Sequence, residues 1–313
     1  MVMSICGIIF SPLIALLSGI LMLGLTRKFM ARIHWRYGPP LLQPVIDIIK
    51  LFYQKAPSHG KLFDFGVILS LTGSIVVLLF LPVGKLAPLS SSGGLLVITY
   101  LTLIAPLGLA LSGGEAANPN ASIGISRKLV LSFGYEVSLL LGILAVMTRY
   151  ETISIVKVVE IQQESGWALF SWPLLVSGIA YLLILPAILG IRPFDVVSAP
   201  QEISSGPHVE YGGKYLGIST ISHALTEFIA IGLFVNLFLG GWGLWGVISG
   251  IGAGWLVVLL SVLAFLAKIF LLYIVCLLVS AVLPRLRLDQ AVGFLWKWPA
   301  VLAFAGLILA WVV

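Results

Sequence analysis

Four ionisable side chains stand close together in one connecting segment of a chain in which only 10% of the residues are charged. The segment reads RPFDVVSAPQEISSGPHVEYGG, residues 192–213, and it contains Asp195, Glu202, His208 and Glu210. Carboxyl and imidazole groups exchange protons, and the glycines and serines between them allow a mobile backbone. The residue types favour a loop that transmits charge or protonation to buried groups, while ordinary solvated loop charges are the alternative interpretation.

Three further ionisable residues fall inside long apolar stretches. Glu136 and Glu227 each lie about eight residues within such a stretch, which at about 1.5 Å per residue is a depth of roughly 10–12 Å. Lys268 lies near the middle of the longest stretch. A charge in hydrocarbon is costly unless it is neutralised, paired or hydrated, so these three residues are predicted ion-relay groups, with Tyr135 as a candidate hydrogen-bond partner. The alternatives are a protonated glutamate bonded between helices and a lysine buried against a neighbouring subunit.

The composition defines the elements that position these residues. Apolar residues make up 60% of the 313 residues, the mean hydropathy is +1.13, and several apolar runs are about 20 residues long. The runs are continuous and do not alternate with polar residues, which is typical of membrane helices and not of a membrane β-barrel. The sequence therefore predicts an all-α integral membrane protein.

Eight membrane spans are predicted, together with one short amphipathic helix at the membrane surface. The spans cover roughly residues 4–25, 62–82, 94–112, 129–147, 173–191, 220–241, 253–283 and 292–313. No linker rich in Ser, Pro or charge divides them and no internal repeat is evident, so residues 1–313 are predicted to form a single polytopic domain. The first span lacks the basic start and short apolar core of a signal peptide and is expected to remain in the chain.

The distribution of basic residues predicts the orientation. Connections 1–2, 3–4, 5–6 and 7–8 carry seven, two, two and two Lys or Arg residues, while connections 2–3, 4–5 and 6–7 carry one, two and none. Cytoplasmic loops retain positive charge, so both termini of this cell-membrane protein are predicted to face outward. Topology and contact with anionic lipid account for the net charge of +6 without nucleic acid as a partner.

Cysteine and histidine usage gives no pattern of a metal or redox centre. Cys6 and Cys276 lie in apolar spans near opposite ends of the chain, which is too few thiolates for an iron–sulfur cluster. The histidines, which show no pair at ligand spacing, are His34, His59, His208 and His223. We expect no metal and no cofactor in this chain.

Three other connections carry recognisable patterns. In residues 32–61 a break at GPP precedes apolar residues at helical spacing, where Asp47 and Lys50 are three residues apart and can pair. The connection GGEAANPNASIGISRK is rich in Gly and Asn and is expected to be a tight loop. The segment LPRLRLDQAVGFLWKWP mixes basic and aromatic residues as interfacial anchors do. Each pattern is weak alone.

Taken in order, these patterns resemble one family over nearly the whole chain. They are similar to the membrane subunit that joins the peripheral redox arm to the ion-pumping arm in complex I, its subunit 1, and in related membrane-bound hydrogenases. The matching residues are Arg36-Tyr37-Gly38-Pro39, Gln43-Pro44, Asp47, Lys50, Asn118 to Gly124, Arg127, Tyr135-Glu136, Pro193-Phe194-Asp195, Gln201-Glu202, Gly206, Glu210-Tyr211, Gly213, Pro284-Arg285, Arg287, Asp289-Gln290 and Trp296-Lys297.

Two departures from the family pattern indicate a branch. Ser198 and Pro200 stand where many quinone-reducing members carry carboxylates, and GPPLLQP is shorter than the corresponding complex I stretch. Together with SGPHVEYGG, this resembles the ferredoxin-linked branch, meaning the energy-converting hydrogenases or the sulfur-reducing complexes of archaea.

The resemblance implies a non-catalytic coupling subunit within an ion-translocating oxidoreductase. It implies hydrogenase-like or quinone-oxidoreductase-like peripheral partners on the cytoplasmic side, with iron–sulfur clusters and possibly nickel–iron in those subunits, and antiporter-like membrane partners. The residues expected at the interface with the peripheral arm are Arg36, Asp47, Lys50, Arg127, Arg192, Arg285, Arg287 and Asp289.

Three other functions stay open at the level of sequence. One is a quinone-chamber subunit of a complex I-type enzyme. Another is a secondary transporter, although such folds usually carry repeats with interrupted helices in matching halves. The third is a structural membrane anchor, which would leave the cost of Glu136 and Lys268 without a purpose.

Overall fold

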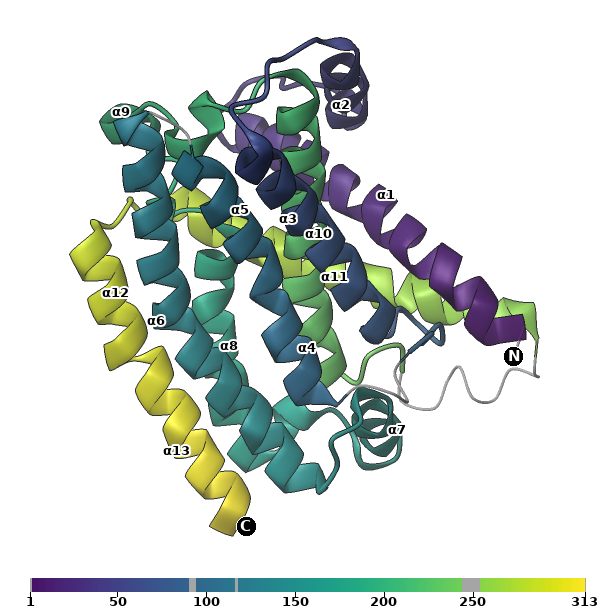
Figure 1. Cartoon of the computed structure of the whole chain (residues 1–313). Coiled ribbons are helices and arrows are strands. Elements are labelled where there is room, and N and C mark those ends of the chain that lie inside the picture. Colours follow the sequence, from purple (N-terminus) through teal and green to yellow (C-terminus); the bar gives the residue numbers. More distant parts are fainter. Residues whose placement is uncertain (1, 90–93, 116–117, 244–253, 313) are drawn as a thin grey trace.

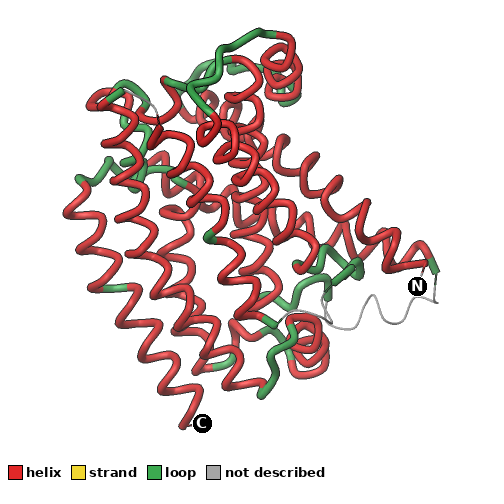
Figure 2. Tube along the Cα trace, in the orientation of Figure 1, coloured by secondary structure: helices red, strands yellow, loops and turns green. Residues whose placement is uncertain are grey.

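The computed structural model describes residues 2–89, 94–115, 118–243 and 254–312, and these residues fold almost entirely into helices (Figures 1 and 2). The predicted all-α class is confirmed. The elements are α1 (Val2–Ile33), α2 (Gln43–Tyr53), α3 (Lys61–Phe80), α4 (Leu95–Thr102), α5 (Ile104–Glu115), α6 (Pro119–Tyr150), α7 (Ile155–Ser165), η1 (Ala168–Phe170), α8 (Trp172–Leu189), α9 (Pro200–Ile203), η2 (Gly206–Val209), α10 (Gly213–Phe238), α11 (Trp255–Val282), α12 (Leu288–Lys297) and α13 (Pro299–Val312).

Eight helical segments in the described part of the chain are long and apolar enough to cross a membrane, as the sequence predicts. Two of them are interrupted: α4 and α5 together form the span Leu95–Glu115, and α12 and α13 form the span Leu288–Val312. The chain is therefore a multi-pass membrane protein. The predicted surface helix is α2, which buries Pro44 and Ile48 and leaves Ile46 and Ile49 exposed.

The fourth span is longer than the sequence indicates, because the expected Gly- and Asn-rich loop is mostly helix. Residues 113–115 end α5, and α6 already begins at Pro119. The Asn118 side chain accepts a hydrogen bond from the Asn120 amide, and Pro119 occupies the first helical turn, where its missing N–H costs nothing. Glu136 consequently lies 17 residues after the start of α6 instead of about eight, near the middle of the helix.

Helix α10 is the central element of the fold. Within its most apolar window 83% of the residues are buried, against 22–61% for the other seven spans. It packs against α1, α2, α3, α8 and α11. In Figure 1, α13, α6 and α8 run beside one another on one flank, while α1 leans away on the other. Most side chains of α10 are thus placed in the interior of the bundle.

The two ends of the molecule differ. Figure 1 shows α2 and α9 at one end, together with the connection that leads into α10, and α7 and both termini toward the other. The segment 192–213 and the first basic connection therefore share one end. Helix α10 runs from this end toward α7 and joins the two.

Helices α3 and α5 cross at very short range because glycines face each other. A Cβ on Gly66 would lie 2.5 Å from the Ser112 nitrogen and 2.6 Å from the Gly108 oxygen. No side chain fits at that separation, so small residues are required for this pair of helices to close on α10.

Candidate functional site

The segment 192–213 is folded back onto the helices and does not extend into solvent. Phe194, Val196 and Ile203 are buried, and α9 and η2 form two short helical turns within it. Ser204, Ser205 and the following glycine have positive φ, which turns the backbone sharply. The segment is thus a compact, packed loop, which we call the coupling loop.

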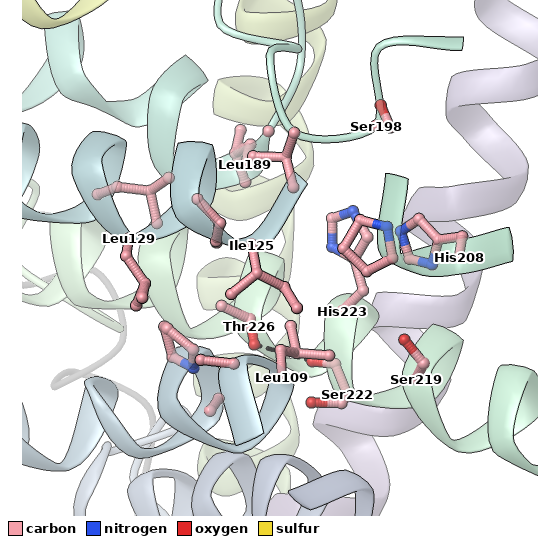
Figure 3. A pocket seen from close by; sticks show the side chains of 18 of the residues that line it. Leu109, Ile125, Leu129, Leu189, Ser198, His208, Ser219, Ser222, His223 and Thr226 are labelled. Carbon is pink, nitrogen blue, oxygen red and sulfur yellow. Dashed lines mark hydrogen bonds between the residues drawn. The ribbon is translucent and has the colours of Figure 1, made fainter. Parts of the chain in front are cut away.

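A cavity of about 140 Å³ lies directly beneath the coupling loop. The loop contributes Asp195, Ser198, His208 and Tyr211 to its wall. Figure 3 shows the rings of His208 and His223 close to each other on one side, with Leu109, Ile125, Leu129 and Leu189 completing the lining. The cavity therefore brings a titratable face of the loop against a titratable face of α10.

The α10 wall of the cavity is a polar stripe at helical spacing. Ser219, Ser222, His223 and Thr226 line the cavity, and Glu227 follows at the next position. These residues occupy positions i, i+3, i+4, i+7 and i+8, which lie on one face of a helix. Polar side chains thus continue from the cavity into the middle of α10.

Glu227 ends this stripe at a junction of three helices. It is only 3% exposed. Its Oε2 accepts a hydrogen bond from the Tyr273 hydroxyl of α11 at 3.2 Å, and the same hydroxyl lies 2.5 Å from Oγ1 of Thr26 on α1. His223 Nδ1 is 3.9 Å from Oε1 of Glu227. Glu227 is therefore linked to His223, whose ring is 46% exposed where it faces the cavity.

A second, smaller cavity of about 50 Å³ lies at Glu136. Tyr135 and Glu136 line it together with Thr226, and Thr226 and Lys128 border both cavities. Tyr135 does not bond to Glu136 but lies 3.2 Å from the Ser132 hydroxyl. The three predicted residues Tyr135, Glu136 and Glu227 thus lie around one polar region that begins at the coupling loop.

The four ionisable residues of the coupling loop separate into two pairs. Asp195 and His208 face the cavity, and the Asp195 carboxylate accepts a hydrogen bond from Ser198. Burial lowers the pKa of His208 below its ordinary value, and the negative charge of Asp195 offsets part of this shift. His208 is therefore held neutral at a pH where a free histidine begins to take up a proton.

Glu202 and Glu210 fasten the coupling loop from outside the cavity. Glu202 receives Arg127 at 2.6 Å and Arg285 at 3.4 Å, and the hydrogen bond from Arg127, followed by the charge of Arg285, lowers the pKa of Glu202. Glu210 lies 3.3 Å from His59 of the connection between α2 and α3. These ion pairs tie the loop to α6, to the segment before α12 and to the first basic connection.

The predicted interface residues gather at the end of the molecule that carries the coupling loop. Asp47 pairs with Arg27 of α1 at 2.6 Å and with Gln43, and not with Lys50 as its spacing suggests. The hydrogen bond from Arg27 lowers the pKa of Asp47. Residues that leave side chains exposed there are Arg36, Lys50, Arg192, Arg287 and Asp289.

Lys268 lies at the far end of α10 from the coupling loop. Its ammonium donates to the carbonyl oxygens of Leu239, Gly241 and Gly243 at 2.7, 2.9 and 2.7 Å. It also lies 4.8 Å from the centre of the Trp167 ring. Because the carbonyl end of a helix carries partial negative charge, this lysine is stabilised there without a carboxylate partner.

Within the described residues, no group of three or more His, Cys, Asp or Glu side chains could hold a metal ion. Cys276 is free and buried, and the side chain of Cys6 lies outside the described part of the chain. The donor set near the cavities consists of hydroxyls, two imidazoles and separated carboxylates. This set suits proton transfer through hydrogen bonds.

Several residues of the site are absent from the sequence predictions. They are Thr26, Lys128, Ser219, Ser222, Thr226 and Tyr273; Ser198 and Tyr211 are noted there only as positions of the family pattern, and His223 only as a non-ligand. One signal was available: the helical spacing of Ser219, His223 and Glu227 within an apolar span. No signal in the sequence links α10 to Tyr273 or Thr26.

The described residues thus form a helical membrane bundle with a buried polar path that begins at an ordered loop. The chain belongs to the NADH dehydrogenase family, whose profile matches residues 6–311. The predicted resemblance to complex I subunit 1 is thereby confirmed.

A solved structure identifies the branch. The chain is similar to a chain in the structure of the membrane-bound sulfane sulfur reductase, described as an archaeal respiratory membrane complex, with 38% identity. The match covers 98% of this chain and 99% of that chain, with a TM-score of 0.91. The protein is therefore a membrane subunit of a complex I-like respiratory complex, in the predicted branch.

Proposed function

We propose that the chain is the non-catalytic coupling subunit of a membrane-bound respiratory oxidoreductase of the sulfur-reductase or hydrogenase type. In this role it connects a redox module at the coupling-loop end to proton or sodium translocation by antiporter-like membrane partners. The observation that carries the proposal is the pair of neighbouring cavities, which Asp195, His208 and His223 line on the loop side and Glu136 on the inner side, together with the 3.9 Å approach of His223 to Glu227. Such a path has no purpose in a passive anchor.

Water completes the path between these groups. A cavity of about 140 Å³ has room for about four or five waters, since each occupies about 30 Å³ in the liquid. The hydroxyls of Ser219, Ser222 and Thr226 can both accept and donate, as can the imidazoles. A proton taken up at the loop can therefore pass to His223 and then to Glu227, which lies one helical turn further along α10.

The ion pairs of the coupling loop support a second part of the proposal, namely that a partner subunit acts on this loop. Arg127, Arg285 and His59 hold Glu202 and Glu210, so a partner that docks on this end acts on the same segment that carries Asp195 and His208. The partner would be the cytoplasmic peripheral module, for which the family resemblance implies iron–sulfur clusters. Its redox event would then alter the protonation of the cavity.

Substitution of the two glutamates within the membrane spans tests the relay. In the complete complex in sealed vesicles, Glu136→Gln and Glu227→Gln should abolish most ion translocation, because an amide keeps the shape but cannot release a proton. Electron transfer by the partner subunits should persist or slow, with the complex intact on a native gel. Glu164→Gln, on exposed α7 at the other end, is the matched control and should behave as wild type.

Normal translocation in both glutamate variants would overturn the proposed function. Asp195→Asn tests the loop in the same assay and should lower the ion gradient formed per electron. Loss of the peripheral subunits from the gel in this variant would instead assign Asp195 to docking.

A further inference from the structure

Lys128 borders both cavities and has no fixed partner. It lies on α6, eight residues before Glu136, which corresponds to about 12 Å along the helix. No hydrogen bond or ion pair to its ammonium occurs among the residues that the structure describes. Its neighbour Arg127 points instead to Glu202, outside the cavities, as successive residues on a helix face different directions.

The ammonium of Lys128 stands between two groups of titratable side chains. The first cavity presents Asp195, His208, Tyr211 and His223 to it. The second cavity presents Tyr135, Glu136 and Tyr181. One cation is thus shared by a carboxylate near the loop and a carboxyl group deep in the bundle, and a lysine stem is long and flexible enough to favour either side.

We propose that Lys128 is a positioning residue that couples proton uptake by the histidine pair to proton release from Glu136. This inference rests on the proposed function and identifies the Lys128 ammonium as the charge that links the two cavities. When His208 or His223 takes up a proton, the added positive charge repels the ammonium toward the second cavity. There the ammonium favours the ionised form of Glu136, whose proton passes to cavity water, so one proton enters and one leaves.

The reverse movement of the Lys128 ammonium restores the starting state. When the histidines return their proton, the negative charge of Asp195 attracts the ammonium back to the first cavity, and Glu136 is free to take up a proton. The two cavities therefore never need to exchange a proton directly. The position of the Lys128 charge couples the protonation of one cavity to that of the other.

The test compares Lys128→Met with Lys128→Arg in the complete complex. Lys128→Met, which keeps the length of the side chain without its charge, should lose most of the ion gradient formed per electron, and Lys128→Arg should restore a large part of it. Infrared difference spectra of the Glu136 carboxyl, assigned with Glu136→Gln, should show its proton released about one pH unit higher in Lys128→Met, a tenfold change in affinity. Lys157→Met, an exposed lysine on α7, is the matched control.

Two outcomes would overturn the inference. One is a Glu136 titration that is unchanged in Lys128→Met; the other is equal loss of coupling in Lys128→Met and Lys128→Arg. If Lys128→Met does not assemble, Lys128→Gln in the same spectroscopic assay decides the question. The proposed function fails separately, since it requires loss of translocation in Glu136→Gln and Glu227→Gln whatever Lys128 does.

Discussion

At the scale of single residues, the environment decides which ionisable groups can respond to a partner. Asp195 and His208 face the cavity of about 140 Å³. Glu202 and Glu210 instead form ion pairs with arginine and histidine side chains. The four loop residues look alike in the sequence but divide into a pair that faces the cavity and a pair that fastens the loop. The environment also distinguishes the two ionisable residues inside the spans: Glu227 accepts a hydrogen bond from Tyr273, whereas Lys268 donates to backbone carbonyls.

His208 gives the coupling loop a pH-dependent stability. Burial lowers the pKa of His208 in the folded loop. Below about pH 6.5 the unfolded loop therefore binds a proton at this histidine more readily than the folded loop does. The local stability consequently falls as the pH drops through this value. Hydrogen–deuterium exchange of residues 192–212, corrected for intrinsic rates, should show increased opening from about pH 7.5 to about pH 5.

The variant His208→Gln should remove this dependence, and His59→Gln, at the other histidine that touches the loop, should retain it. Glu202 does not contribute in this window. Its pKa is lowered by Arg127, so its stabilising effect is lost only as the pH falls below the ordinary glutamate value of about 4.3. An unchanged pH response in His208→Gln would contradict the assignment.

At the scale of elements, α10 is fixed at both ends and packed along its length. At its carbonyl end Lys268 and Gln162 satisfy the last oxygens: Gln162 donates to Asn236 and Leu237, and Lys268 donates to the three carbonyls that follow the helix. At its amino end the chain turns at Gly213, whose φ is +46°. A helix held in this way can keep its polar stripe in register with the loop.

Lys268→Met should destabilise the protein more than it affects proton transfer. Each buried carbonyl left without a donor costs about 1–3 kcal/mol, so three of them should lower the thermal stability of the purified complex clearly. Lys157→Met should not. If Lys268→Met leaves the melting temperature unchanged but stops translocation, Lys268 is a relay group, as the sequence predicts.

The crossing of α3 and α5 should not tolerate an added methyl group. Gly66→Ala should weaken the packing of these helices on α10, because the new Cβ would overlap backbone atoms of α5. Gly142→Ala in α6, where a Cβ would meet no atom within 4 Å, is the matched control and should stabilise its helix by up to about 1 kcal/mol. Thermal unfolding in detergent measures both, and equal effects would refute the close crossing.

At the scale of the whole molecule, the fold separates the end that carries the coupling loop from an opposite end that carries the termini. The coupling loop, α2 and the predicted interface arginines share the first end, and α7 lies toward the second (Figure 1). Helix α10 spans between them through the most buried part of the bundle. The proposed coupling would therefore act along a single element, from one end of the molecule into its interior.

The distribution of charge predicts how these two ends are oriented in the membrane. Single cysteines introduced as Gln54→Cys or Ser204→Cys, in a chain without native cysteines, should react only from the cytoplasmic side, and Lys157→Cys only from outside. The reason is the excess of Lys and Arg in the connections at the coupling-loop end. Labelling of Ser204→Cys from outside with a membrane-impermeant reagent would reverse the topology and the proposed docking side.

The sequence by itself determined the class of protein, since apolar runs of about 20 residues must form membrane helices and their number fixes the passes. It also identified the family and three groups near the buried path: Tyr135, Glu136 and Glu227. Local spacing failed for Asp47, whose partner is Arg27 of another helix, and for the Gly- and Asn-rich connection, which packing turned into helix.

Only the tertiary structure decided which polar groups meet. Tyr273 bonds to Glu227 across 46 positions and to Thr26 across 247, and the cavities join the coupling loop to the middle of α10. Such contacts depend on how helices cross, and crossings are set by many small packing terms spread over the chain, such as the Gly66–Gly108 approach. No local sequence pattern gives the total of these packing contributions, so the polar path could be identified only from the packed helices.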